Sequence, residues 1–268
     1  MLTNTANKII PLWKFRGFIL GSIKREFQTK YRNSILGIAW PILNPLVMIL
    51  IYTLVFSQVM KSKLPGIDDT FSYSIYLCIG IITWNLFTEI TIRGQNVFLD
   101  NANLIKKLNF PKLCLPLIVI GSALLNFVIV FVIFTIFLLL TNHFPGAAYF
   151  AVFPLLFLQV LFAISLGISL GVLNVFFRDI GQFYSIFLQF WFWLTPIVYP
   201  SEILPAVVRP YLQLNPMTNL INAYHDIFVN QQSPDWSSLY YIAALTLIFA
   251  FTGYRLFLKH GGEMVDEL

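Results

Sequence analysis

Charged residues are scarce in this chain, and so are cysteines. Only 11% of its 268 residues are charged, while 58% are hydrophobic and the mean hydropathy is +0.77. Soluble domains carry about 25% charged residues and are at most about half apolar. The composition therefore excludes a water-soluble fold with one core, a coiled coil and a disordered protein. The two cysteines, Cys78 and Cys114, have no metal-ligand spacing and do not form the framework of a disulfide-stapled secreted module.

The chain also lacks the motifs that carry common enzyme chemistry. It contains no phosphate-binding GxxxxGKS or GxxxxGKT loop and none of the patterns HExxH, CxxC or GxSxG. Its three histidines, His143, His225 and His260, lie far apart in the sequence, and no paired carboxylates occur inside an apolar run. We therefore expect no catalytic residue, no metal and no cofactor in this chain.

Long apolar runs are what the sequence does contain. Six of them approach or exceed the about 20 residues that a membrane-crossing helix needs. They cover about 38–60, 71–92, 116–141, 149–177, 181–199 and 239–258. The runs are continuous and do not alternate with polar residues, which excludes membrane-spanning strands. The predicted fold is an all-α integral membrane protein with six transmembrane helices, whose membrane domain covers residues 38–260.

The basic residues predict how these helices are oriented. If the N-terminus is cytoplasmic, the outer segments hold only Lys61, Lys63 and Arg209 among the 17 lysines and arginines. Cytoplasmic segments of membrane proteins are enriched in these residues. Both termini are therefore predicted to be cytoplasmic, with residues 261–268 as a short tail. This bias accounts for the net charge of +5, and no nucleic-acid partner is expected.

Residues 1–37 hold the densest positive charge. Apolar residues recur there at near-helical spacing: Leu12, Phe15, Ile19, Ile23, Phe27 and Tyr31. The pattern predicts a cytoplasmic amphipathic helix that lies on an anionic membrane surface. Three charged residues interrupt the apolar arc, and Gly17 and Gly21 are positions where the helix could break into two pieces.

Two connections between the predicted spans are longer than a turn. The inner connection, 93–115, suits a short helix presented to a cytoplasmic partner. The outer connection, 200–236, contains two apolar pieces, Ile203–Tyr211 and Met217–Val229, each too short to span. Bilayers accept such segments when they pack against protein or water. We therefore expect two interfacial or re-entrant half-helices on the outer side, between the fifth and sixth spans.

Ionisable residues are nearly missing from the middle of the predicted spans, where they would mark an ion or proton pathway. Glu89 and Arg93 lie four residues apart near the end of the second span and can pair along one helix face. A structural ion pair is favoured over a role in coupling. No internal repeat supports an inverted-repeat secondary transporter. A membrane protein with a pathway and no visible energy source is expected to take its energy from another subunit.

Five segments stand out by their order and spacing. They are Lys30–Trp40 with Asn44–Leu46, Asn101–Lys107 with Phe110–Lys112, Phe176–Ile180, Thr195–Pro200 and Leu214–Thr218. In this order they resemble the membrane subunits of ABC exporters for bacterial surface polysaccharides, a group that includes the O-antigen, capsule and teichoic-acid exporters. The resemblance covers about residues 12–260.

The resemblance implies a channel-forming permease in the bacterial inner membrane, and not an enzyme. It implies two copies of the chain in each transporter and two separate cytoplasmic ATPase subunits that bind ATP and Mg²⁺. The implied substrate is a long glycan such as O-antigen, often linked to polyprenyl pyrophosphate. Three alternatives stay open: an ABC permease for a drug or a small lipid, an integral-membrane glycan transferase, and a structural scaffold.

The resemblance also assigns roles on the inner side. The stretch 101–112 would form a coupling helix that docks on the ATPase. Its candidate residues are Asn101, Asn103, Lys106, Lys107 and Pro111. Arg178 and Asp179, on the shorter inner loop, are second candidates for this contact. The alternatives are a solvated basic loop that only sets topology and an ion pair that closes a helix end.

Lys30, Tyr31 and Arg32 precede the first span at the depth of the inner headgroups. Lysine and arginine bind phosphate through charge-assisted hydrogen bonds. We therefore expect these three residues to form a gate that receives the pyrophosphate of a lipid-linked glycan. The alternative is ordinary attraction to anionic membrane lipids.

Aromatic side chains make up 17% of the chain. Flat rings can line a path along which the apolar C–H faces of a sugar chain slide. The candidates for such a glycan pathway are Trp84, Phe87, Tyr184, Trp191 and Tyr199. The alternative is the aromatic belt that tryptophan and tyrosine form at membrane interfaces.

An outer gate is expected where the fifth predicted span ends. Pro196 and Pro200 lack backbone N–H donors and would end or bend that helix. Together with Asn215 and Pro216, at the start of the second half-helix, they are the candidates for the gate. The alternative is a structured cap that does not move.

Overall fold

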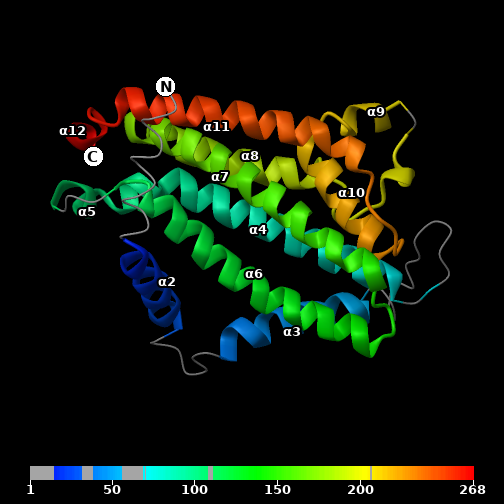
Figure 1. The fold of residues 1–268 in the computed structure, drawn as a ribbon. Helices are drawn as coiled ribbons and strands as arrows, with labels where there is room; N and C mark the ends of the chain where they lie inside the picture. Colours follow the sequence, from blue (N-terminus) through cyan, green and yellow to red (C-terminus); the bar gives the residue numbers. More distant parts are fainter. Residues whose placement is uncertain (1–14, 32–38, 56–68, 70, 108–110, 206) are drawn as a thin grey trace.

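The computed structural model describes residues 15–31, 39–55, 69, 71–107, 111–205 and 207–268, without the side chains of Lys30, Tyr31, Pro41 and Glu202. Its helices, with 3-10 helices marked η, are α2 (Arg16–Tyr31), α3 (Trp40–Tyr52), α4 (Ser72–Asp100), α5 (Ala102–Lys107), α6 (Cys114–Leu140), η3 (Gly146–Ala151), α7 (Val152–Phe176), α8 (Asp179–Trp193), η4 (Ser201–Ile203), α9 (Arg209–Leu212), α10 (Pro216–Phe228), η5 (Trp236–Leu239), α11 (Tyr240–His260) and α12 (Met264–Glu267). No strand occurs in the described ranges, which confirms the all-α prediction for them (Figure 1).

Four helical segments are long and apolar enough to cross a membrane. They are Ser72–Asp100, Cys114–Leu140, Gly146–Phe176 and Trp236–His260. These segments correspond to the second, third, fourth and sixth predicted spans, and the chain is a multi-pass helical membrane protein. α4 continues beyond the predicted end of its span, through Arg93 to Asp100.

The first and fifth predicted spans form shorter helices than expected. α3 has 13 residues and α8 has 15, fewer than the about 20 residues that a straight crossing needs. α8 ends at Trp193 and not at Tyr199. A proline disfavours helical geometry at the residue before it, so Pro196 stops the helix early. Part of the first predicted span, 56–60, lies outside the described residues.

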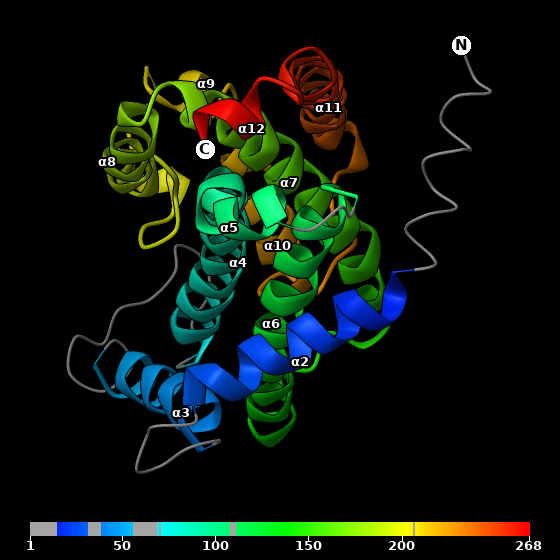
Figure 2. The ribbon, with the colours of Figure 1, turned by 90° about the vertical axis from the view of Figure 1, so that its left-hand side faces the viewer.

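α4 and α7 cross at the centre of the bundle, where glycines let their backbones touch. A Cβ atom on Gly171 would lie 2.6 Å from the carbonyl oxygen of Gly94, and one on Gly167 would lie 3.2 Å from that of Thr91. Small residues four apart on one helix are a common means of close packing in membranes. α6 packs on the other side of α4, and α11 packs on the other side of α7 (Figures 1 and 2).

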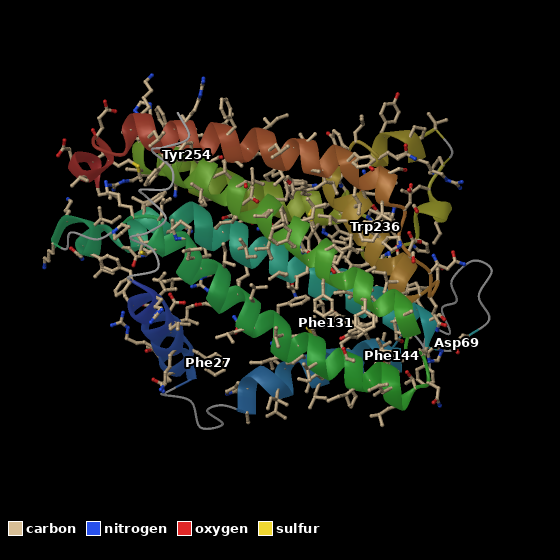
Figure 3. The ribbon with its side chains drawn as sticks, viewed as in Figure 1. Phe27, Asp69, Phe131, Phe144, Trp236 and Tyr254 are labelled. Atoms are coloured by element: carbon tan, nitrogen blue, oxygen red, sulfur yellow. The ribbon has the colours of Figure 1, made fainter. Side chains whose placement is uncertain are left out.

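The outer connection forms one of the two expected half-helices. α10 covers the second apolar piece almost residue for residue. Its Phe228 ring lies 5.9 Å, centroid to centroid, from Phe131 of α6, and this contact holds α10 within the bundle. Phe131 is labelled in Figure 3. The prediction of one half-helix over Ile203–Tyr211 was wrong. The described residues of this piece hold the end of η4, extended Leu204, a turn at 207–208 and the start of α9. Prolines 205 and 210 lack the N–H donors that a continuous helix would need.

α2 packs along the inner half of α6 (Figure 2). Ser22 is buried there, and Ile23 lies directly over Gly121 of α6. The helix runs through Gly17 and Gly21 without a break. A glycine in a helix costs only about 1 kcal/mol relative to alanine, so a packed face can keep the helix continuous. α12 lies toward the same end of the bundle, where it packs on α5 and α7.

Candidate functional site

The predicted coupling segment forms a short helix that is anchored by one apolar side chain. Ile105 of α5 is buried, while Asn103, Lys106 and Lys107 are exposed. Ile105 belongs to an apolar group, the inner cluster, whose members come from α4, α5, α6, α7 and α12. The inner cluster consists of Val97, Phe98, Ile105, Leu115, Val119, Val172, Val175 and Met264. A force on the exposed face of α5 therefore reaches the ends of three long helices.

The chain around α5 is held by hydrogen bonds at both ends. The Asn101 side-chain amide donates to the carbonyl oxygen of Val97 at 2.9 Å, which ends α4. The carbonyl oxygen of Asn101 accepts from the N–H groups of Leu104 and Ile105. Beyond α5, Pro111 is half-buried, and the ammonium group of Lys112 donates to the carbonyl oxygen of Gly261. Residues 108–110 between them lie outside the described part of the chain.

The second inner loop presents its charges to the solvent. Arg178 and Asp179 are both exposed at the start of α8, and neither forms an ion pair within the described residues. Asn174 fixes this loop, because its side-chain oxygen accepts from the N–H of Gly181 at 2.9 Å. Its amide nitrogen donates to the side chain of Asn96 at 3.1 Å. The loop is thus tied to the same end of α4 as α5.

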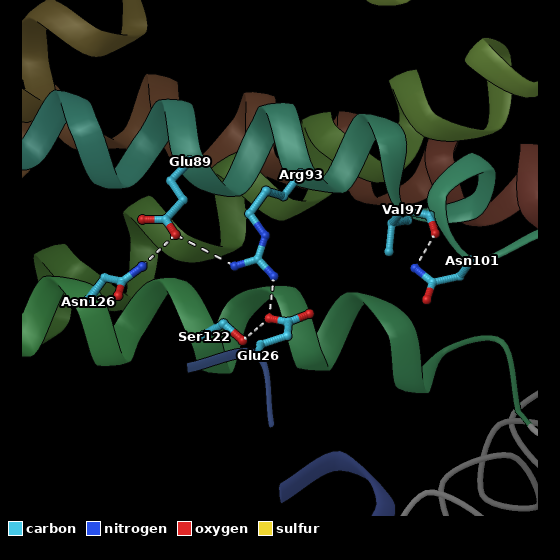
Figure 4. A network of polar contacts seen from close by, with 7 residues as sticks. All are labelled: Glu26, Glu89, Arg93, Val97, Asn101, Ser122 and Asn126. Atoms are coloured by element: carbon cyan, nitrogen blue, oxygen red, sulfur yellow. Dashed lines mark hydrogen bonds and ion pairs between the residues drawn. The ribbon is translucent and has the colours of Figure 1, made fainter. Parts of the chain in front are cut away.

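A polar network joins α2 to α4 and α6 (Figure 4). One guanidinium nitrogen of Arg93 lies 2.6 Å from Glu26 of α2, and the other lies 3.6 Å from Glu89. The hydroxyl of Ser122 donates to Glu26, and the amide of Asn126 donates to Glu89 at 2.8 Å. The predicted pairing of Glu89 with Arg93 is confirmed. The shorter bond to Glu26 was not predicted, because it joins residues 67 apart in the sequence.

The residues of the predicted pyrophosphate gate lie where α2 ends. Lys30 and Tyr31 are the last two residues of that helix, but their side chains lie outside what the structure describes. Arg32 also lies outside the described residues. The role of these three residues therefore stays a prediction.

Three of the five predicted pathway rings meet between α4 and α8. Trp84 and Phe87 lie edge to face against Trp191, with ring centroids 6.0 and 5.2 Å apart. Tyr184 is buried on the same helix as Trp191. Tyr199 lies beyond the end of α8, where its hydroxyl donates to the carbonyl oxygen of Trp193 at 2.7 Å. Within a single copy, then, most of these rings pack against protein.

The rings that α8 leaves uncovered are different ones. Phe183, Phe190 and Trp193 are 71%, 66% and 65% exposed. They occupy the face of α8 opposite its buried residues, Tyr184 and Leu188. These three residues were not among the predicted pathway rings, although their spacing on the helix indicates a shared face.

The end of α8 is fastened to the start of α10 by Asn215. Its side-chain oxygen accepts from the indole N–H of Trp191 at 2.7 Å and from the backbone N–H of Met217 at 3.0 Å. Its amide donates to the hydroxyl of Thr195 at 2.9 Å. Asn215 is thus the N-cap of α10, with Pro216 as the first helical residue. We call Trp191, Thr195 and Asn215 the outer latch.

The turn after α8 is fastened to the start of α4. The hydroxyl of Tyr76 donates to the carbonyl oxygens of Pro196 and Tyr199, at 2.8 and 2.9 Å. Tyr73 donates to the carbonyl oxygen of Val198 at 2.8 Å. Pro200, the last predicted gate residue, is buried directly after this turn. Two of the predicted gate residues, Pro196 and Pro200, therefore belong to a segment whose backbone acceptors are bonded to α4.

A buried glutamine joins three of the central helices. The side chain of Gln159 in α7 donates to the carbonyl oxygen of Thr83 in α4 at 2.8 Å. It accepts from the hydroxyl of Tyr224 in α10 at 2.9 Å. This contact was not predicted from the sequence. A lone glutamine in the middle of an apolar run was the available signal, because a buried amide needs partners.

The arrangement suits the transmission of force between the two ends of the bundle. The described residues contain no group of three or more histidine, cysteine or acidic side chains that could hold a metal ion. What they contain is a charged, anchored inner end, a fastened outer end, and long helices that connect the two.

Comparison with known proteins gives a consistent result. Residues 19–229 match the family model described as "ABC-2 type transporter". The chain is 30% identical over 260 residues to the O-antigen export system permease protein of Myxococcus xanthus, covering 96% of this chain and 97% of that protein. It is 30% identical over 207 residues to an O-antigen export permease of Klebsiella pneumoniae, covering 77% and 78% of the two chains. It is 24% identical over 239 residues to a polysialic acid transport protein of Escherichia coli, covering 87% and 89%.

Proposed function

This chain belongs to the ABC-2 type transporter family, and we propose that it is the channel-forming permease of an exporter for a bacterial surface polysaccharide. Family membership makes it a multi-pass transport subunit of the inner membrane, which works with ATP-binding subunits and is not itself an enzyme. The polysaccharide is proposed because relatives that match most of the chain are named as O-antigen and polysialic acid transporters.

The observation that best supports the proposal is the packing of α5 at the inner end of the bundle. Lys106 and Lys107 project from α5, whose Ile105 is locked into the inner cluster with the ends of α4, α6 and α7. An ATPase that binds this face would move a packed unit and not a loose loop. Bistable packed interfaces are what convert small shifts at one site into helix movement. Asn101, Asn103 and Pro111 on the same segment, with Arg178 and Asp179 beside it, complete the proposed docking face.

The proposed assembly contains two copies of this chain and two ATPase subunits, which bind ATP and Mg²⁺. In it all six predicted spans cross the membrane, with α3 and α8 as the two short ones and both termini in the cytoplasm. The exposed lysines and arginines of the inner end support this orientation. Short spans are compatible with a membrane that thins locally beside them.

The glycan passes between the two copies in this proposal. The exposed rings of α8 give each copy a face on which sugar rings can slide, and Trp84, Phe87 and Tyr184 support that face from behind. Trp191 and Tyr199 lie at its outer end, next to the gate formed by Pro196, Pro200, Asn215 and Pro216. Lys30, Tyr31 and Arg32 are proposed to receive the pyrophosphate of a lipid-linked glycan at the inner side.

The test is a detergent pull-down of this chain from its native membranes, followed by an ATPase assay. We expect a subunit with nucleotide-binding motifs to co-purify and to hydrolyse ATP faster when polyprenyl-linked glycan is added. The double variant Lys106→Ala/Lys107→Ala should lose this stimulation, while Lys259→Ala, a matched exposed lysine on α11, should keep it. A chain that purifies without any ATPase would contradict the proposal.

A further inference from the structure

A large polar hollow opens at the outer end of the bundle. Its volume is about 670 Å³. It is lined by α10, η5, the first turns of α4 and α11, and by Pro200, Ser201 and Gln213 of the outer connection. Ligand-binding pockets in proteins have volumes of about 300 to 1,000 Å³. The hollow lies on the far side of α10 from the apolar contact with Phe131, and it is separate from the residues of the outer latch.

The lining is rich in hydrogen-bonding groups and carries no lysine or arginine. The residues that matter are Gln213, Asn219, Asn222, His225, Asp226 and Asp235. Within the described part of the chain, the amides of Asn222 and Gln213 form no hydrogen bond, so their donors and acceptors are available to a ligand. Carboxylates accept hydrogen bonds, whereas amides both donate and accept. Such a set suits a ligand with many hydroxyl groups.

The polar groups of the hollow are held in place before any ligand arrives. Asp235 accepts from the backbone N–H and the hydroxyl of Ser237, at 3.0 and 2.7 Å. Asp226 accepts from the amide of Asn230 at 3.0 Å. His225 lies 3.1 Å from the carbonyl oxygen of Tyr76 and stacks on the Tyr76 ring at 3.7 Å between centroids. Because a carbonyl can only accept, the Nε2 atom of His225 carries the proton in this bond.

The charge of the hollow discriminates between ligand classes. Asp226 and Asp235 bring negative charge, and no lining cation offsets it. An anionic ligand would meet like charges without a partner, which costs binding free energy. A neutral sugar ring meets acceptors, donors and the exposed aromatic ring of Tyr241 instead.

We propose that this hollow is a carbohydrate-binding site that holds uncharged, hydroxyl-rich sugar units of the exported glycan on the outer side of the membrane. The inference rests on the proposed function and deepens it, because it names the class of sugar. One of the proteins similar to this chain is named as a transporter of polysialic acid, an acidic polymer. For this chain the hollow favours neutral units.

The test uses the full-length chain with its ATPase partner in lipid nanodiscs. Binding of neutral hexasaccharides of glucose, mannose, galactose and rhamnose is compared with that of a sialic acid hexamer, by saturation-transfer NMR and calorimetry. We expect at least one neutral hexasaccharide to bind and the sialic acid hexamer not to bind. Asn222→Ala should weaken the neutral binding about two- to tenfold, the range for one lost hydrogen bond. Gln28→Ala, a change of an exposed amide on α2 far from the hollow, should have no effect.

Asp226→Asn provides a second arm of the test. It removes one negative charge and keeps the shape of the side chain, so it should raise the binding of the sialic acid hexamer. Absence of binding for every neutral hexasaccharide, or equal binding of neutral and acidic ones, would overturn the inference. Export of surface glycan and ATPase activity are measured on the same variants. Normal glycan export without binding of any hexasaccharide would contradict only the sugar site. Absence of glycan export by the unaltered transporter would contradict the proposed function itself.

Discussion

The outer and inner ends of this bundle are held together by different kinds of interaction. At the outer end, side chains bond to particular backbone and side-chain atoms, as in the outer latch and the contacts of Tyr76. At the inner end, an apolar cluster packs beneath exposed lysines, and the side-chain hydrogen bonds of Asn101 and Asn174 hold only the loops beside it. When one partner of a buried hydrogen bond is removed, the other is left unsatisfied and the fold loses stability. Substitutions in apolar packing or of exposed charges cost less stability.

The difference matches what each end is proposed to do. A gate must hold one geometry against a passing polymer, and directional hydrogen bonds can specify that geometry. A docking face must stay accessible to a partner, and exposed charges remain hydrated until the partner arrives. Substitutions of the hydrogen-bonded side chains at the outer end should therefore change stability, while those of the exposed side chains of α5 at the inner end should change coupling at nearly unchanged stability.

The largest effect is expected for Asn215→Ala. This change removes the N-cap of α10 and leaves the indole N–H of Trp191 without its partner. Loss of a cap costs about 1 kcal/mol and an unpaired buried donor about 1 to 3 kcal/mol, so unfolding should become easier by about 2 to 4 kcal/mol. Unfolding in detergent, followed by tryptophan fluorescence, measures it. Asn103→Ala is the inner-end control, and equal stability of the two variants would break the comparison.

A smaller loss is expected for Tyr76→Phe. The hydroxyl of Tyr76 donates to two carbonyl oxygens of the turn after α8, and the ring itself stays in place. Removing the hydroxyl should lower the free energy of unfolding by about 1 to 2 kcal/mol, because two buried acceptors lose a donor. The matched control is Tyr240→Phe, since the Tyr240 side chain is 74% exposed. The melting temperatures of both variants measure this loss. An unchanged melting temperature for Tyr76→Phe would contradict the predicted loss of stability.

A pH-dependent contribution is expected from Asp69, which caps α4 (Figure 3). It accepts from the N–H groups of Phe71 and Ser72, at 2.9 and 2.7 Å, and lies 3.1 Å from His143. Burial alone would raise the pKa of Asp69, but the Ser72 hydroxyl, His143 and the two backbone bonds together hold this pKa below its usual value.

Because the pKa of Asp69 is lower in the folded state, its stabilising contribution is present above the unfolded pKa of about 3.9. It is lost as the pH falls from there through the folded pKa. Asp69→Asn should therefore lower stability by about 1 kcal/mol at neutral pH, and the difference from the unaltered protein should shrink below about pH 4. Melting temperatures of both proteins between pH 3 and 7 measure this, and a difference that is constant with pH would exclude it.

A still smaller effect is expected for Glu26→Gln, on the inner side. Glu26 and Arg93 are 44% and 29% exposed, so their ion pair is well hydrated and should contribute less than about 1 kcal/mol. We expect α2 to separate from α6 more readily, with the rest of the bundle unaffected. Limited proteolysis of α2 measures this separation, and Glu263→Gln serves as a control elsewhere at the same end. Identical cleavage of α2 in the unaltered protein and in both variants would argue against a role of Glu26 in holding α2 on α6.

The smallest effect on stability is expected for Lys106→Ala/Lys107→Ala. Both side chains are exposed and make no contact that holds the fold, so the free energy of unfolding should change by less than about 0.5 kcal/mol. Stimulation of the partner ATPase by glycan should nevertheless be lost. A variant that is stable and fully stimulated would contradict the role of α5, while a destabilised one would break the contrast between the two ends.

Features that depend on neighbouring residues were predictable from the sequence. The apolar runs gave the four long helices, because the length and hydropathy of a run are local properties. The short helix α5 and the half-helix α10 were expected from interruptions by polar residues and prolines. The pairing of Glu89 with Arg93 followed from their spacing on one helix. The half-helix expected over 203–211 is not formed as one helix, because its prolines lack the N–H donors that a continuous helix needs, despite its apolar composition.

The contacts that define the two ends were decided only by the tertiary structure. Tyr76 meets Pro196 across 120 residues, and Trp191 meets Asn215 across 24. No local pattern encodes these partners, because they depend on how closely the helices approach one another. That approach is set where Gly94 and Gly171 bring the backbones of α4 and α7 into contact. The sequence alone thus determined that this is a helical membrane protein whose basic residues gather in the connections at one end of its predicted spans. The packing of its helices decided which residues form the latch, the inner cluster and the polar hollow.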